Sequence, residues 1–115
     1  MVFRKGVEKI MDNDLLEKIK QVCRINTAQN ILTISIEELA ELTQVICKLK
    51  RLTNNDKTLR KESSQIYKEL KEELSDVYLL LEQIKLITAI NNYEIEQRIS
   101  EKIRRTFEKV GVSNQ

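Results

Sequence analysis

ISIEELAEL, residues 34–42, and LKEELSDVYLLL, residues 70–81, decide the fold, because each sets a pair of acids into apolar sequence at helical spacing. The pairs are Glu38 with Glu41 and Glu73 with Asp76. Residues at positions i and i+3 share one face of a helix, so each pair aims two carboxylates at one point. A third of the residues are charged, so such pairs also arise on solvated helix faces. Two pairs, each on the apolar side of its helix, favour a shared site.

Four carboxylates pointing from two helices into one cleft repel each other strongly unless a cation lies between them. Carboxylate oxygens are hard ligands that suit Mg²⁺ or Mn²⁺. The chain has no histidine, which excludes Ser-His-Asp triads, His-based zinc sites and the di-iron bundles that need Glu-x-x-His. The residues therefore predict a magnesium or manganese site made of carboxylates.

The composition predicts an all-α protein. There is no proline, only two glycines and few aromatic residues among 115, so the turn residues and aromatic residues that punctuate strands are scarce. The expected organisation is a loose segment at 1–12, one helical domain at 13–111 and a tail at 112–115. Within the domain the apolar periodicity predicts helices at 13–24, 28–52, 59 or 63 to 89, and 92–110. Expected helix boundaries are N-caps at Asp12 or Asn13, Asn26 or Thr27, and Asn92, and a stop at Gly111.

The second predicted helix has an unusually broad apolar surface, where a surface helix needs only one apolar stripe. We therefore expect it to be buried on two sides, as at the centre of an oligomer. The residues that make this surface are Ile31, Ile34, Leu42, Val45, Ile46 and Leu49.

Charge and hydropathy narrow the cellular setting. The formal net charge is +2 with acids and bases mixed, so no basic tract indicates a nucleic-acid partner. No apolar run is long enough for a signal peptide or a membrane span. Cys23 and Cys47 are isolated and are expected to be reduced core residues. These features together predict a cytoplasmic protein that binds no membrane.

The same phrases carry a family resemblance. Gln29, the run IEELAEL at 36–42, the run EELSDV at 72–77 and Lys102 on a closing helix resemble the MazG-like nucleotide pyrophosphohydrolases of the all-α NTP pyrophosphatase superfamily. The resemblance covers residues 28–107, and it implies a bundle of about four helices completed by dimerisation, as a homodimer or a dimer of dimers. It also implies Mg²⁺-dependent hydrolysis of a nucleoside triphosphate to the monophosphate and pyrophosphate, with Mg²⁺ held by Glu38, Glu41, Glu73 and Asp76.

The chain departs from the pattern of this family in three places. Some dCTP-directed members place a Tyr one turn after the Asp, and here that position is Leu80, with Tyr78 on a different face, which leaves the choice of base open. The stretch between Glu41 and Glu73 is longer than usual, which predicts an extended loop or extra turns near 53–64. The closing helix usually carries a Lys followed by an Asn, and here Lys102 is followed by two arginines and a threonine. These departures leave the placement of the loop and the phosphate contacts open.

Candidate residues for the chemistry follow from the helix faces. Glu37 or Glu41 would orient the attacking water. Lys48 lies seven residues after Glu41 on the same face and would hold phosphate, with a solvated lysine as the alternative. The last helix carries a basic stripe made of Arg98, Lys102, Arg105 and Lys109. We expect Lys102 and Arg105 to bind phosphate; the alternative is that the stripe is only a solvated charged face. Gln29 would contact the base or sugar, or merely cap a helix.

The alternative function is a catalytically silent helical oligomer that acts as a nucleotide-binding or regulatory module. Such a module and the enzyme would differ in one observable property, which is the release of pyrophosphate from a nucleoside triphosphate.

Overall fold

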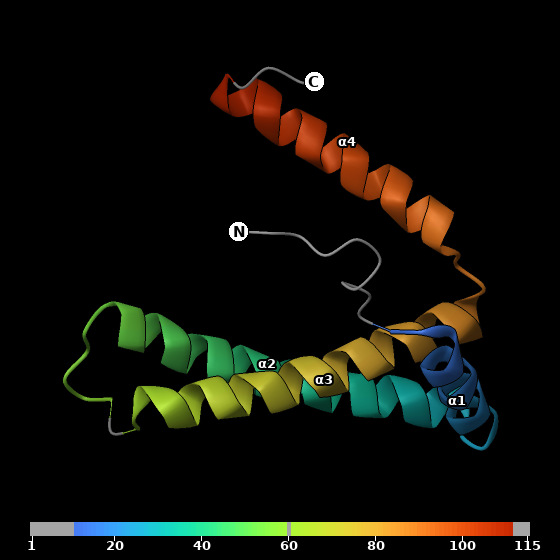
Figure 1. Ribbon diagram of the computed structural model, residues 1–115, viewed down its shortest axis with the longest axis horizontal. Helices are drawn as coiled ribbons and strands as arrows, with labels where there is room; N and C mark the ends of the chain where they lie inside the picture. Colours follow the sequence, from blue (N-terminus) through green and yellow to red (C-terminus); the bar gives the residue numbers. More distant parts are fainter. Residues whose placement is uncertain (1–10, 60, 112–115) are drawn as a thin grey trace.

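The computed structural model describes residues 11–59 and 61–111, which form four helices and no strand (Figure 1). The helices are α1 (Asn13–Arg24), α2 (Ala28–Thr53), α3 (Ser63–Thr88) and α4 (Asn92–Val110). The prediction of an all-α fold is confirmed for these residues, and the predicted helix bounds agree to within one residue once Ser63 is taken as the start of α3. Most of the predicted loose segment at 1–12, and all of the predicted tail at 112–115, lie outside the described residues.

Capping interactions explain where the helices begin and end. The Asp12 side chain accepts a hydrogen bond from the Leu15 amide at 2.8 Å, and the Thr27 hydroxyl accepts one from the Asn30 amide at 3.1 Å. The cap predicted at position 92 lies one residue earlier, because Asn91 and Glu94 form a reciprocal capping box. Gly111 ends α4 with φ of +76°, in the left-handed region that glycine adopts without steric cost.

The core is an antiparallel hairpin of α2 and α3, with α1 packed on α3 at the end away from the α2–α3 loop (Figure 1). Along α2 the side turned to α3 has residues at steps of four, three, four and three, namely Ile31, Ser35, Glu38, Leu42 and Val45. The buried apolar side chains are Ile19, Ile31, Val45, Ile66, Val77 and Leu80. The site described below lies between these two helices.

Hydrogen bonds attach the first part of the α2–α3 loop, residues 54–58, to the end of α2. The Arg51 guanidinium donates to the Asp56 carboxylate at 3.1 Å and to the Thr58 hydroxyl at 2.7 Å. Asp56 also accepts hydrogen bonds from the amide and hydroxyl of Thr58, which together with Arg51 hold the pKa of its carboxyl below the ordinary value. Within the segment near 53–64 that was predicted to form an extended loop or extra turns, residues 54–58 thus form an ordered turn that begins where α2 ends.

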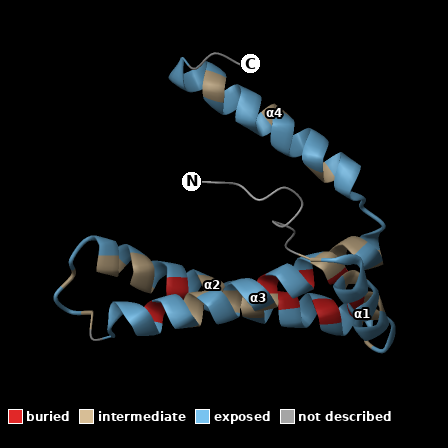
Figure 2. Cartoon of the chain, in the orientation of Figure 1, coloured by how far each residue is buried: buried red, intermediate tan, exposed pale blue. Residues whose placement is uncertain are grey.

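Helix α4 extends away from the hairpin, and Figure 2 shows no buried residue on it. Within the described residues it does not pack along any other helix. Its stripe of Ile99 and Ile103 is about half exposed, at 48% and 47%. No other helix among residues 11–59 and 61–111 therefore packs on the apolar face of α4.

The broad apolar surface predicted for α2 is only partly buried in the single chain. Ile31 and Val45 belong to the core, whereas Ile46 remains 50% exposed. Both cysteines are free, but Cys47 is exposed, so the expectation of a core position was wrong for it within one protomer. Val45 faces α3, and a position two residues further lies roughly 200° around the helix. Among the described residues no helix has both the length and the apolar character needed to cross a bilayer.

Candidate metal centre

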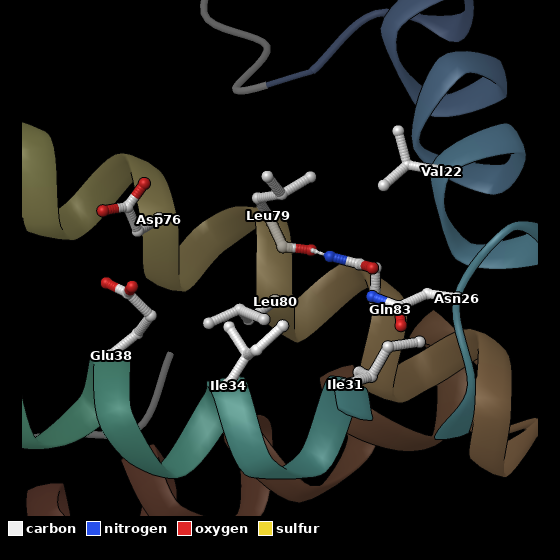
Figure 3. A pocket seen from close by; sticks show the side chains of 9 residues that line it. All are labelled: Val22, Asn26, Ile31, Ile34, Glu38, Asp76, Leu79, Leu80 and Gln83. Atoms are coloured by element: carbon white, nitrogen blue, oxygen red, sulfur yellow. Dashed lines mark hydrogen bonds between the residues drawn. The ribbon is translucent and has the colours of Figure 1, made fainter. Parts of the chain in front are cut away.

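Three carboxylates meet midway along the α2–α3 hairpin. Glu38 comes from α2, and Glu73 and Asp76 come from α3. One carboxylate oxygen from each residue lies within 4.8 Å of the other two. Figure 3 shows the carboxylates of Glu38 and Asp76 facing each other across the space between the two helices. The antiparallel pairing brings together Glu38 of α2 with Glu73 and Asp76 of α3, which are three of the four acids that the two sequence phrases predicted to share a site.

Glu38 and Glu73 occupy positions that the helix spacing reserves for packing. Glu38 lies between Ser35 and Leu42 on the side of α2 that faces α3. Ser35 is buried but is satisfied by donating to the Ile31 carbonyl at 2.6 Å. When both acids are ionised, Oε2 of Glu38 and Oε2 of Glu73 are shielded from solvent and have no hydrogen-bond partner among the described residues. Only a proton on Glu38 would let it donate a hydrogen bond to Glu73. Buried polar atoms without partners are rare because each costs free energy, so these two call for a ligand.

The electrostatic environment of the three acids also favours a bound cation. Desolvation, followed by the negative charges of Glu41, Asp76 and Glu73, raises the pKa of Glu38 to about 7. Desolvation and the charges of Glu41 and Asp76 also raise the pKa of Glu73. None of the ion pairs formed by the described residues involves Glu38, Glu73 or Asp76. Three close carboxylates without a basic partner fit a hard divalent cation, and the donor set does not by itself name the ion.

Glu41 lies at the edge of this cluster. It is exposed, yet its charge acts on both Glu38 and Glu73, so its carboxylate is near theirs. It also lines a groove of about 420 Å³ that runs between α2 and α3 toward the loop, together with Gln44, Lys48 and Glu69. Glu41 is therefore placed between the three central acids and open solvent.

Lys48 lies in that groove, as its spacing from Glu41 predicted. Its ammonium is 3.7 Å from the Glu69 carboxylate, which also pairs with Lys61 in the loop just before α3. The hydrogen bond from Lys61, more than any other contact, holds the pKa of Glu69 below its ordinary value. Glu69 thus gathers two lysines from separate segments at the loop end of the groove.

The structure does not bring the remaining candidates to the cluster within one protomer. Gln29 and Glu37 are exposed on α2, and neither lines the groove. Lys102 and Arg105 are exposed on α4, which packs along no other helix of the described chain. Lys102 and Arg105 would reach the acids only through a rearrangement or from another copy of the chain.

Two polar residues near the cluster were not singled out from the sequence, Glu69 and Gln83. Gln83 is buried at 4% exposure in the apolar end of α3. It lies three residues after Leu80 and seven after Asp76, so the helix spacing that located the acids also marks it. Glu69 carried no comparable signal, because its partner Lys61 is placed by the loop.

The chain matches no known protein family, no curated protein and no solved structure. Its function is therefore inferred from the residues and the geometry of the site.

Proposed function

We propose that the protein is a Mg²⁺-dependent nucleoside triphosphate pyrophosphohydrolase of the MazG-like kind, which releases a nucleoside monophosphate and pyrophosphate. The observation that carries the proposal is the cluster of Glu38, Glu73 and Asp76, with buried carboxylate oxygens that no described residue satisfies. The resemblance of the two acidic phrases to that family supplies the reaction.

In this proposal Glu38, Glu73 and Asp76 hold the cation, with Glu41 at its open side. When bound, Mg²⁺ would offset the charge of the phosphate oxygens, which is most of what phosphoryl transfer requires. Glu41 accepts a hydrogen bond from water and orients it toward the α-phosphorus. The new bond forms between this water oxygen and phosphorus, the α–β phosphoanhydride bond breaks, and the water proton passes to Glu41. Glu37 was the other candidate for this role, and its exposed place outside the groove favours Glu41.

Lys48 is the candidate cation for the phosphates, because it shares a groove with Glu41 and Glu73. We expect Lys48→Ala to raise KM about tenfold, the effect of losing one charge-assisted contact of about 1.4 kcal/mol. Lys50→Ala is the matched control, since Lys50 is exposed on the same helix and does not line the groove. Steady-state kinetics would remove Lys48 from the site if the two variants had equal KM values.

A homodimer, or a dimer of dimers, is part of the proposal because two apolar faces of the described chain lack a cover. On α2 the exposed side chains are Leu32, Ile36, Leu39 and Ile46, and on α4 they are Ile99 and Ile103. Monomers rarely expose contiguous apolar surface of this kind. Association would also allow the basic stripe of α4, including Lys102 and Arg105, to approach the acids of another protomer.

We expect light scattering at micromolar concentration to give at least twice the 13.5 kDa mass of one chain. The physical reason is burial of the exposed α2 side chains, which Ile36→Glu should prevent by placing a charge at a position that is 71% exposed in one protomer. A 13.5 kDa species in the unaltered protein would contradict the oligomer.

The test of the activity is pyrophosphate release from a panel of ribo- and deoxyribonucleoside triphosphates with Mg²⁺, with the nucleotide product identified. Equal amounts of monophosphate and pyrophosphate are expected. Binding of a triphosphate without turnover would favour the silent nucleotide-binding module instead.

A further inference from the structure

Two lysines from separate segments meet one carboxylate at the loop end of the groove between α2 and α3. Lys61, in the loop before α3, donates a hydrogen bond to Oε1 of Glu69. Lys48, on α2, approaches Oε2 of the same carboxylate with its ammonium at 3.7 Å. Because Glu69 precedes Glu73 by one turn of α3, this ion triad of Lys61, Glu69 and Lys48 lies close to the acid cluster.

The two ion pairs of the triad differ in closeness. Lys61 is hydrogen-bonded to Glu69, and this contact lowers the pKa of the Glu69 carboxyl more than any other. Lys48 is too far from Glu69 for a hydrogen bond, and Oε2 of Glu69 is shielded from solvent without a hydrogen-bond partner among the described residues. Lys61 is therefore the main partner of Glu69, and the donors of Lys48 remain available to a ligand.

The charge of Lys48 matters because acids outnumber lysines along the walls of the groove. The carboxylates that line it belong to Glu41, Glu69, Glu72 and Glu73, and the ammonium groups belong to Lys48 and Lys68. Like charges repel, so a polyphosphate could enter only if these acids were compensated. A cation held by the acid cluster would compensate one end of the groove. At the loop end Lys61 compensates Glu69, although Lys61 does not line the groove itself.

We propose that Lys61 is a positioning residue, which pairs with Glu69 and thereby keeps Lys48 available for the terminal phosphate of the substrate. Without Lys61, the ionised Glu69 would pair directly with Lys48 and remove its charge from the groove. The proposal rests on the proposed function, which places the α-phosphate at the acids and assigns Lys48 to the phosphates. It gives the α2–α3 loop a role in substrate binding, since this loop carries Lys61 to Glu69 (Figure 1).

A rescue experiment tests this role. Lys61→Ala should raise KM about tenfold, as Lys48→Ala does, and should leave kcat nearly unchanged because the contact acts on binding. Adding Glu69→Gln to Lys61→Ala removes the charge that captures Lys48, so KM should return close to the value of the unaltered protein. A merely structural role of the contact predicts no such recovery, because the double variant lacks both partners. Circular dichroism checks that each variant keeps its helices.

Two further variants serve as controls for the charge of Lys61. Lys61→Arg keeps the positive charge and should keep the KM of the unaltered protein. Lys57→Ala removes a lysine that is exposed in the same loop and forms no ion pair among the described residues, so it should also leave KM unchanged. Equal KM values for Lys61→Ala and Lys57→Ala, or no recovery in the double variant, would overturn the proposal.

Binding of inorganic pyrophosphate with Mg²⁺ separates this inference from the hydrolysis itself. Calorimetric titration should give binding about tenfold weaker to Lys61→Ala than to the unaltered protein, with recovery in the double variant. This pattern without hydrolysis of any triphosphate would end the proposed function and leave the role of Lys61 standing. Hydrolysis with the same pyrophosphate affinity and the same KM in Lys61→Ala as in the unaltered protein would leave the enzyme and end the role of Lys61.

Discussion

Replacing Glu38 by Gln, or Asp76 by Asn, is expected to reduce Mg²⁺-dependent pyrophosphate release by a factor on the order of 10² or more. Each change keeps the shape of the side chain and removes one negative charge from a cluster whose oxygens lie within 4.8 Å of one another. Losses of this size accompany removal of one preorganised electrostatic group from an active site. Pyrophosphate release under saturating Mg²⁺ measures the effect, and far-ultraviolet circular dichroism checks that the helices remain.

The matched control for this loss is Glu96→Gln. Glu96 is exposed on α4 and forms no ion pair among the described residues, so the same chemical change there removes a charge and nothing else. Its rate should equal that of the unaltered protein. Rates within a few-fold of wild type for both Glu38→Gln and Asp76→Asn would place the catalytic site elsewhere.

The second large effect is on stability without a cation. In EDTA at pH 8, Glu38→Gln should raise the melting temperature by about 4 °C, corresponding to a gain of roughly 1 kcal/mol in the free energy of unfolding. The reason is that a shielded carboxylate beside three other acids is replaced by a neutral amide. Adding Mg²⁺ should then stabilise the unaltered protein more than the variant, because binding to the native state adds stability by mass action. Protein concentration is held fixed, since an oligomer melts at a concentration-dependent temperature.

The stability gained by Glu38→Gln in EDTA should depend on pH in a definite direction. The folded-state pKa of Glu38, about 7, is above the ordinary value of 4.5, so the folded protein binds more protons than the unfolded one between these values. The contribution of Glu38 to stability is therefore present below pH 4.5 and is lost as pH rises through 7. The advantage of Glu38→Gln in EDTA should be small at pH 5 and full at pH 8. An advantage that is equal at both pH values, or absent at both, would show that Glu38 is not held in a desolvated acidic cluster.

The helices and the acid cluster were predictable because both depend on local spacing. Asp12, Thr27 and Gly111 mark helix ends through side-chain or backbone chemistry that acts over three or four residues. Glu38 and Glu73 stand where the apolar period puts packing residues, so an antiparallel hairpin of two helices suffices to bring them together. Asp76 follows Glu73 at i+3 and shares its face. No knowledge of the loop conformation was needed for these steps.

Other parts of the site depend on contacts that no local pattern encodes. The pairing of Lys61 with Glu69 requires the particular path of the loop, which Arg51 and Asp56 fix. The hollow beside Gln83, which Figure 3 shows, requires α1 to pack on α3, and nothing in the sequence of either helix states where the resulting gap lies. The position of Lys102 relative to the acids depends on which surface packs against α4. The sequence of α4 does not identify that surface.

Binding of Mn²⁺, followed by the loss of its electron paramagnetic resonance signal, tests the metal centre most directly. Mn²⁺ prefers the same hard oxygen ligands as Mg²⁺, and its binding can be measured without any nucleotide. We expect a saturable site in the unaltered protein and in Glu96→Gln, competition by Mg²⁺, and loss of that site in Glu38→Gln and Glu73→Gln. Identical Mn²⁺ titrations for all four proteins would contradict it.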